Sequence, residues 1–184
     1  MNPSEKELIK QLKAGNESAF RDLVALFQDR VFHTALGLLQ QAEDAEDASQ
    51  DVFIKIYRAI HGFREDSELS TWIYRITVTR CLDMLRSRKR KARWNRLLGF
   101  EGSRNGEPAN FVHPGVLLDR KEQAVELFRH LAKLAPNQQA AFVLHKMEGL
   151  TYAEIAGILQ VSEKAVDGLL QKARINLKKR LENK

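Results

Sequence analysis

The chain has 184 residues, of which 43% are hydrophobic and 29% are charged, as is ordinary for a soluble globular protein. No run of about 18 apolar residues could cross a membrane, and the first residues lack the order of a signal peptide. The single cysteine, Cys81, excludes an internal disulfide and a cysteine-rich metal site, and its apolar helical setting favours a buried thiol. We therefore predict a cytoplasmic protein, and its isoelectric point near 9.5 indicates an acidic partner, nucleic acid first.

Apolar residues recur along the chain with the 3.6-residue period of a helix, without convincing alternation of the kind found in strands. This pattern predicts an all-α fold. The helices expected in the first half cover residues 4–14, 17–39, 44–60 and the stretch after the loop that follows Phe63. The residues expected to cap the second, third and fourth helices are Asn16, Asp44 or a neighbour, and Ser67 or Ser70.

The composition changes at residues 99–115, which hold four of the ten glycines and two of the four prolines. This composition is typical of a linker. We therefore predict two small helical domains, residues 1–97 and 117–184, joined by a flexible linker at 98–116. The linker would span roughly 20–25 Å as a coil and roughly 55–60 Å when extended, so the domains could bind one elongated partner at separate places.

The helix expected at 44–60 begins with acidic residues and gathers polar side chains on one face. Asp47, Gln50, Asp51 and Ile54 share that face, and Phe53 lies beside it. Two interpretations remain open. The acids either form an ordinary solvated helix face, or they form a protein-docking surface bordered by an exposed aromatic ring.

The stretch 63–96 opens with a short polar loop and ends in a dense basic run. Between residues 75 and 96 there are nine arginines and lysines against the single acid Asp83, whereas the whole chain has a net charge of only +6. A local basic helix with aromatic residues beside it is typical of a nucleic-acid-binding surface. The alternative is a solvated basic helix end that the helix dipole favours.

Residues 151–174 carry the most specific local pattern. Two helices are expected between the linker and this segment, over about 116–134 and 136–148, and Gly149 is expected to be left-handed. Thr151 and Glu154 form a capping box, and Ser162 caps a second helix after a short turn. This order predicts a helix-turn-helix whose second helix enters the DNA major groove, with an ordinary helical hairpin as the alternative.

Several of these motifs resemble one family, the bacterial RNA polymerase sigma factors of the extracytoplasmic-function type. In the second half, Leu134-Ala-Pro136, Ala141–Leu144 and Glu148–Ala156 resemble the region of the family called region four, as do Ser162 and Ala173-Arg174. In the first half, the segments similar to region two are Ala14-Gly-Asn16 with Ala19-Phe20, Asp44–Phe53, Phe63–Ser67 and Thr71–Ile76. Four weak motifs in the expected order make a strong resemblance.

The resemblance implies roles for the first domain. The helix 44–60 would dock on the clamp coiled coil of the polymerase β′ subunit, and the residues implied are Asp44, Asp47, Gln50, Asp51, Phe53 and Ile54. The loop 64–68 would capture a base flipped from the −10 element. The residues implied at the −10 element are Arg64, Glu65, Asp66, Ser67, Trp72, Arg75, Thr79, Arg80, Asp83 and Arg86. Lys89 to Arg93 would hold phosphates without sequence preference.

Two of these residues have an alternative role. Asp83 would either accept a hydrogen bond from a cytosine amino group or pair within its helix with Arg80 or Arg86. Trp72 would either pack in the core or act in base stacking and strand separation.

The implied −35-reading helix departs from the family pattern. Relatives often carry Gly-Thr-Val, a basic residue, then Ser-Arg, whereas this chain has Lys164-Ala-Val-Asp167-Gly168-Leu169. Asp167 would either read a cytosine edge or give an unusual −35 preference, and Gly168 suggests a close backbone approach, such as to DNA. The −35 residues implied are Lys164, Asp167, Gly168, Gln171, Lys172 and Arg174.

The function implied is that of a stress-response transcription initiation factor without a cofactor. It would bind core RNA polymerase through the β′ clamp and the β flap, read −10 and −35 promoter elements, and help open DNA. An anti-sigma factor is the implied regulator, and it could hold the protein at the inner membrane without direct insertion. No catalytic or metal-binding constellation occurs in the sequence, so we predict that the protein is not an enzyme.

Two other functions remain as alternatives. A stand-alone helix-turn-helix regulator would bind duplex DNA without polymerase, but it would leave the acidic face unexplained. A helical protein-binding adaptor would carry the basic run only incidentally, and it would lack the steep salt dependence that phosphate contacts produce.

Overall fold

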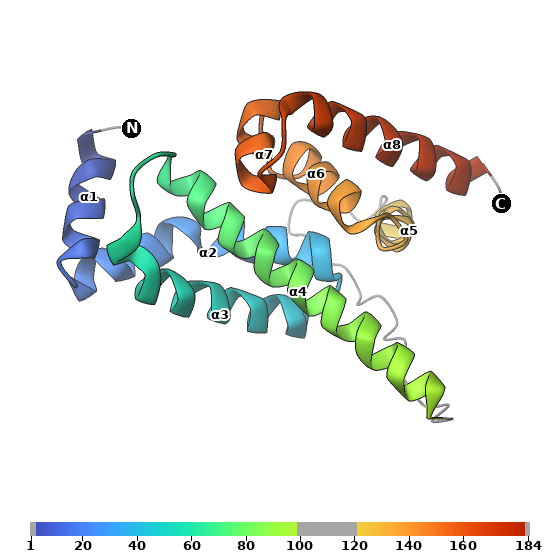
Figure 1. Ribbon diagram of the computed structural model, residues 1–184, viewed down its shortest axis with the longest axis horizontal. Coiled ribbons are helices and arrows are strands. Elements are labelled where there is room, and N and C mark those ends of the chain that lie inside the picture. Colours follow the sequence, from blue (N-terminus) through green and yellow to red (C-terminus); the bar gives the residue numbers. More distant parts are fainter. Residues whose placement is uncertain (1–2, 99–120, 183–184) are drawn as a thin grey trace.

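The computed structural model describes residues 3–98 and 121–182, with side chains described for 5–98 and 126–182. The described residues form eight α-helices, one 3₁₀ turn and no strand, which confirms the all-α prediction (Figure 1). Most of the predicted linker, 99–116, and residues 117–120 lie outside the described residues. The elements are α1 (Pro3–Lys13), α2 (Glu17–Leu39), α3 (Ala42–Ala59), η1 (Ile60–Gly62), α4 (Leu69–Leu97), α5 (Lys121–Leu131), α6 (Pro136–Lys146), α7 (Tyr152–Leu159) and α8 (Glu163–Glu182).

The start of α2 is capped as predicted. The side-chain oxygen of Asn16 accepts hydrogen bonds from the backbone N–H groups of Ser18 and Ala19, at 2.8 and 3.2 Å. The start of α3 differs from the prediction, because its capping position is Gln41, whose side chain makes no capping bond. Asp44 lies inside the first turn instead, where its charge still favours the positive end of the helix dipole.

The predicted serine cap of α4 is wrong. The capping position is Glu68, which makes no capping bond, and the N–H of Leu69 donates to the Glu5 carboxylate of α1 at 3.0 Å. A side chain 64 positions away in the sequence therefore satisfies this helix end. Local sequence could not reveal the cap, since it depends on how α1 packs.

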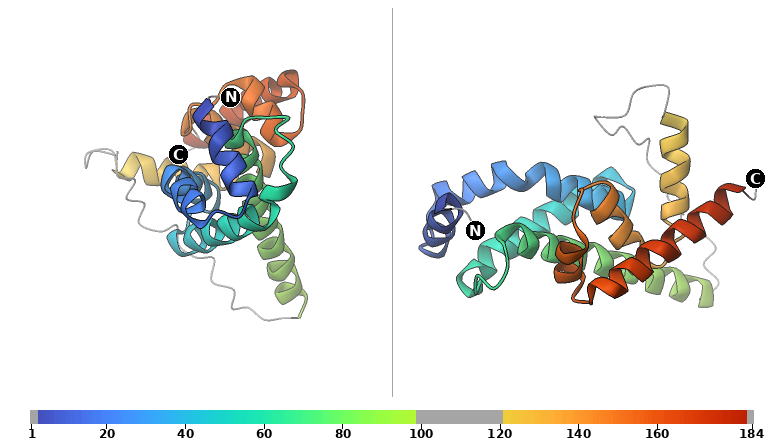
Figure 2. Two further views of the ribbon diagram at one scale, coloured as in Figure 1. Left: turned by 90° about the vertical axis from the view of Figure 1, so that its left-hand side faces the viewer. Right: turned by 90° about the horizontal axis from the view of Figure 1, so that it is seen from above.

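The first half is a layer of α2 and α3 crossed by the long α4, with α1 closing one end (Figure 1). The core at that end contains Ile9, Leu23, Ile56 and Ile73, each at most 1% exposed. These residues come from all four helices, so α1 belongs to the domain. The C-terminal part of α4 extends beyond the other helices, as Figures 1 and 2 both show.

The second half, α5 to α8, packs directly against the first half (Figures 1 and 2). One continuous core joins the end of α2 and the middle of α4 to α5, α6, α7 and α8. Leu38 and Cys81 of the first half share it with Leu131, Leu144 and Leu170 of the second. Hydrophobic burial therefore holds the two halves together.

Candidate polymerase and promoter interface

The outer face of α3 is exposed and mixes acidic with apolar side chains. Asp47 and Gln50 are exposed, Ile54 is 49% exposed, and Tyr57 is 51% exposed. The opposite side of the helix is buried and carries Ala45, Ala48, Val52 and Ile56. This packing leaves the acidic and apolar stripe in solvent. Phe53 differs, since it is half-buried and packs on the core of the first half.

Asp44 and Asp51 point from α3 toward α4 rather than outward. The Asp51 carboxylate accepts hydrogen bonds from the Arg80 guanidinium, whose Nε lies at 2.8 Å, and Asp44 forms an ion pair with Arg88. The sequence placed Asp51 in the polymerase-binding set and Arg80 in the promoter-binding set. The structure brings these two side chains together.

The loop between η1 and α4 projects polar side chains into solvent. Arg64, Glu65 and Asp66 are exposed and Ser67 is half-exposed. Glu65 adopts a left-handed backbone conformation, with φ of 64°, and its carboxylate pairs with Lys13 of α1 at 2.6 Å. A contact from another helix therefore restrains the loop at its centre.

Trp72 was expected either to pack in the core or to act in base stacking and strand separation. It is half-buried, packs on the core of the first half, and contacts the buried Phe63 with tilted rings whose centroids are 5.0 Å apart. The structure thus shows core packing for part of the indole. The rest of its surface is exposed to solvent.

Along α4, some of the side chains implied at the −10 element are exposed, and others are bound to other residues of the protein. Thr79, Asp83 and Arg86 are exposed, and Asp83 forms the expected intrahelical pair with Arg86 at 2.9 Å, while its contact with a cytosine stays a prediction. Arg75 is half-buried, and its guanidinium donates to the carbonyl of Gly157 in α7 at 2.8 Å. Beyond these residues, Lys89 to Arg93 carry exposed charges on the part of α4 that projects from the body (Figure 1).

The helix-turn-helix is formed by α7 and α8, as predicted. Thr151 and Glu154 make the reciprocal capping box, and Ser162 accepts from the N–H of Ala165 at 3.2 Å. The chain is left-handed at Gly149 (φ 70°) and again at Gln160 (φ 55°) in the turn. Hydrogen bonds from the Thr151 side chain and backbone lower the pKa of Glu154, because they favour its charged form.

The start of α8 presents its implied −35 residues to solvent. Lys164, Gln171, Lys172 and Arg174 are exposed, while Asp167 accepts a hydrogen bond from Gln171 at 2.8 Å. A side chain added at Gly168 would meet no atom within 4 Å. No close packing within the described residues requires this glycine, so its expected role in a close approach remains a prediction about DNA.

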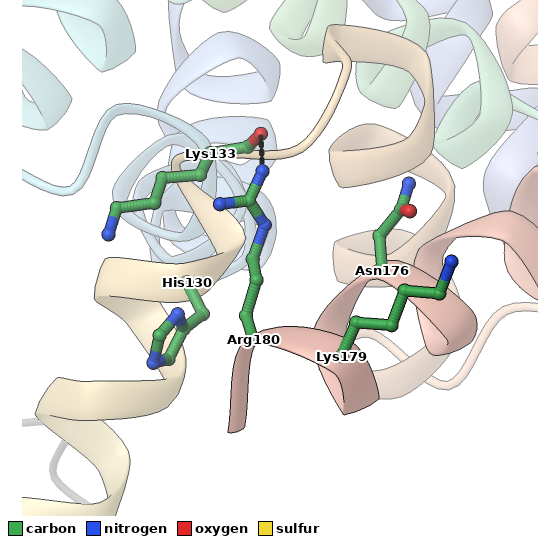
Figure 3. A pocket seen from close by; sticks show the side chains of 5 residues that line it. All are labelled: His130, Lys133, Asn176, Lys179 and Arg180. Carbon is green, nitrogen blue, oxygen red and sulfur yellow. Dashed lines mark hydrogen bonds between the residues drawn. The ribbon is translucent and has the colours of Figure 1, made fainter. Parts of the chain in front are cut away.

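A second basic feature was not foreseen from the sequence. A hollow of about 430 Å³ lies between α5 and α8 (Figure 3), lined by His130, Lys133, Asn176, Lys179 and Arg180. Arg180 is restrained there by a hydrogen bond of 3.5 Å to the carbonyl of Lys133. Lys179 lies about 22 Å along α8 from Lys164, so the hollow is remote from the groove-entering end of the helix.

Contacts between the halves were also missed by sequence reasoning. The Tyr74 hydroxyl donates to the Glu148 carboxylate at 2.8 Å, across 74 positions of sequence. Burial, together with this neighbouring negative charge, raises the pKa of Tyr74.

No helix among the described residues is long and apolar enough to cross a membrane. The same described residues contain no cluster of three or more metal-binding side chains.

Comparison with known proteins identifies both halves. Residues 23–91 match the family model of Sigma-70 region 2, and residues 124–177 match that of Sigma-70 region 4. The chain is 32% identical over 177 residues to the ECF RNA polymerase sigma factor SigM of Mycobacterium tuberculosis, covering 95% of this chain and 83% of SigM. It is 29% identical over 181 residues to SigW of Bacillus subtilis, covering 96% of each chain.

Solved structures show the same fold. CnrH in complex with the cytosolic domain of CnrY has a TM-score of 0.70 at 24% identity, covering 97% of each chain. RpoE from Bartonella quintana, in complex with the anti-sigma factor NepR, has a TM-score of 0.71 at 20% identity, covering 89% of this chain and 96% of that one. With regions two and four in order along one chain, this protein belongs to the ECF group of the sigma-70 family and is a promoter-specific transcription initiation factor of RNA polymerase.

Proposed function

We propose that the outer face of α3 binds core RNA polymerase, at the clamp of its β′ subunit. The observation that carries the proposal is the exposed stripe of Asp47, Gln50 and Ile54, with Tyr57 beside it. Apolar side chains left half-exposed beside carboxylates suit a partner surface that is both basic and apolar. Asp47 and Ile54 are the central contacts, because Asp44 and Asp51 are already paired with α4.

The −10 element is read by the 64–68 loop and the exposed face of α4. Arg64 and Asp66 offer a donor and an acceptor on a loop that Lys13 restrains through Glu65, and Trp72 lies in the first turn of the helix that follows the loop. Such a loop can hold a base outside the stack, where its hydrogen-bonding edge becomes accessible. The exposed charges at Lys89 to Arg93 bind phosphates and add affinity without sequence preference.

The −35 element is read by the start of α8. Lys164, Lys172 and Arg174 are exposed and can contact DNA, and the exposed Gln171 donates to Asp167 and holds it in a defined position. Asp167 can accept a hydrogen bond from a cytosine amino group in the major groove. Its negative charge would be unfavourable beside a phosphate, so we assign it to base recognition.

The protein acts in the cytoplasm with further protein partners. A second polymerase contact, with the β flap, belongs to the domain that carries α5 to α8. An anti-sigma factor is the proposed regulator, and it is supported by the solved structure of similar fold in which the sigma factor RpoE of Bartonella quintana is bound by the anti-sigma factor NepR.

The decisive experiment reconstitutes transcription. The purified protein is added to core polymerase with a library of promoter fragments from the same genome, and specific transcripts are sequenced. We expect transcripts that start downstream of shared −10 and −35 elements. Failure to bind core polymerase, or an absence of specific transcripts, would show that the docking and promoter assignments are wrong.

A further inference from the structure

Two charged side chains of α1 reach the loop that we assign to the −10 element, residues 64–68. The Lys13 ammonium lies 2.6 Å from the Glu65 carboxylate, near the centre of the loop. The Glu5 carboxylate accepts a hydrogen bond of 3.0 Å from the N–H of Leu69, the first residue of α4. Because Glu5 lies near the start of α1 and Lys13 is its last residue, one helix holds the loop at its middle and at its exit.

The entrance of the loop is anchored in the core beside the same helix. Phe63, which precedes the loop, is 5% exposed and contacts Trp72 with ring centroids 5.0 Å apart. The Lys13 ammonium lies 6.0 Å from the centroid of the Phe63 ring, within the range of a cation–π contact. Lys13 therefore contacts both the buried anchor and the centre of the loop.

Glu65 has a backbone conformation that is unfavourable for its residue type. Its φ is 64°, in the left-handed region, where a residue with a β-carbon has a higher free energy than glycine. Such conformations persist where surrounding contacts impose them, and they gather at functional sites. Lys13 supplies such a contact, because it holds the side chain of this same residue.

The ion pair separates anchoring from reading within the loop. The Glu65 carboxylate is bound to Lys13, whereas Arg64 and Asp66 on either side of it are exposed. Resting on the proposed function, we infer that Lys13 and Glu65 are positioning residues of promoter recognition. They fix the loop in the conformation in which Arg64 and Asp66 meet the −10 bases, and Glu65 itself reads no base.

The positioning role affects promoter selectivity more than the stability of the fold. The Lys13 and Glu65 side chains are 31% and 39% exposed, and ion pairs with such exposure contribute little to stability. A loop that is already ordered loses less conformational freedom when it binds a base, so the pair favours binding. Ordering one or two side chains in advance corresponds to a factor of about 3 to 10 in affinity.

Promoter binding by the holoenzyme tests this role. Full-length Lys13→Ala and Glu65→Ala are each assembled with core polymerase, and affinity is measured for a promoter found by transcription and for copies with single −10 substitutions. The ratio of these affinities should fall by a factor of about 3 to 10 in each variant, while affinity for core polymerase stays unchanged. The double variant should lose no more than either single variant, because the two side chains act as one pair. Losses that multiply in the double variant would overturn the inference, since the two residues would then contact DNA independently.

Two further variants of α1 are the controls. Lys13→Arg keeps a cation within reach of Glu65 and should retain the −10 selectivity of the wild type. Lys10→Ala removes the same charge from an exposed position of the same helix and should retain it as well. A loss in Lys10→Ala equal to that in Lys13→Ala would overturn the inference, because the overall charge of α1 would then be responsible. Urea unfolding should give the same stability for both alanine variants.

Proteolysis reports on the loop without polymerase or DNA. Trypsin cleaves after Arg64, and its access depends on how often the loop leaves its folded conformation. Mass spectrometry should find this cleavage several-fold faster in Lys13→Ala than in the wild type or in Lys10→Ala. Equal rates would overturn the restraint by Lys13, whatever the promoter result.

Arg64→Ala and Asp66→Ala separate this inference from the proposed function. If these variants lose −10 selectivity while Lys13→Ala keeps it, the positioning role alone is overturned. If neither they nor Lys13→Ala change the selectivity, the loop does not read the −10 element, and the proposed function is wrong at this site.

Discussion

Asp51 of α3 accepts hydrogen bonds from Arg80 of α4, so a carboxylate expected to bind polymerase neutralises an arginine expected to bind DNA. Both side chains are more than a third exposed, so the pair stabilises the fold by at most about 1 kcal/mol. The pair links α3 to α4 across their exposed edge. Asp47 is exposed and forms no such ion pair with α4, which is why we propose it as a polymerase contact.

This division predicts different outcomes for two neighbouring acids. Asp47→Lys should weaken binding to core polymerase at least about tenfold, because a repulsive charge in a desolvated contact costs several kcal/mol. Asp51→Asn should change core affinity less than about threefold and unfolding free energy by less than about 1 kcal/mol. Fluorescence titration with core polymerase and urea unfolding measure the two effects. Equal losses of affinity would show that Asp51 is itself a polymerase contact.

The cap of α4 by Glu5 predicts a stability effect from the first helix. Glu5→Ala should lower the unfolding free energy by about 1 kcal/mol, since it removes the acceptor for the Leu69 N–H. Glu7→Ala is the control on the same helix, because Glu7 is exposed and binds only Gln11, a contact of about 0.3 kcal/mol. Urea unfolding compares them. Equal losses would mean that the capping bond contributes nothing.

The capping box of α7 predicts a pH-dependent stability. The folded pKa of Glu154 is lowered below its ordinary value of 4.5, so its stabilising contribution is present above pH 4.5 and is lost as the pH falls through the folded pKa. The free-energy difference between the wild type and Glu154→Gln should therefore be largest near neutral pH and shrink in acid. Urea unfolding at pH 3 to 7 measures it, and a constant difference would contradict the assignment.

The exposed end of α4 predicts salt dependence without sequence preference. Lys89→Ala with Lys91→Ala should weaken holoenzyme binding to all promoters alike and reduce the slope of log affinity against log salt by about 2. Lys164→Ala should instead weaken binding most for promoters with an intact −35 element. Filter binding at several salt concentrations separates the two. Promoter-selective effects of the first variant would show that this end of α4 reads bases.

The sequence by itself determined the local structure. The Asn16 cap, the capping box of Thr151 with Glu154, and the left-handed Gly149 all follow from interactions within a few residues, and each was confirmed. The apolar period likewise predicted the all-α fold, since a helix must bury one face. The family could be identified because its motifs are short segments with residues at fixed spacing.

Only the tertiary structure decided which charged groups are free. Asp51, Arg75 and Glu65 looked like surface residues, yet each is held by a partner more than 25 positions away. Periodicity locates a side chain on a face of its helix but does not show what packs against that face. For the same reason the sequence could not show that the two predicted domains share a buried core across α2, α4 and α6.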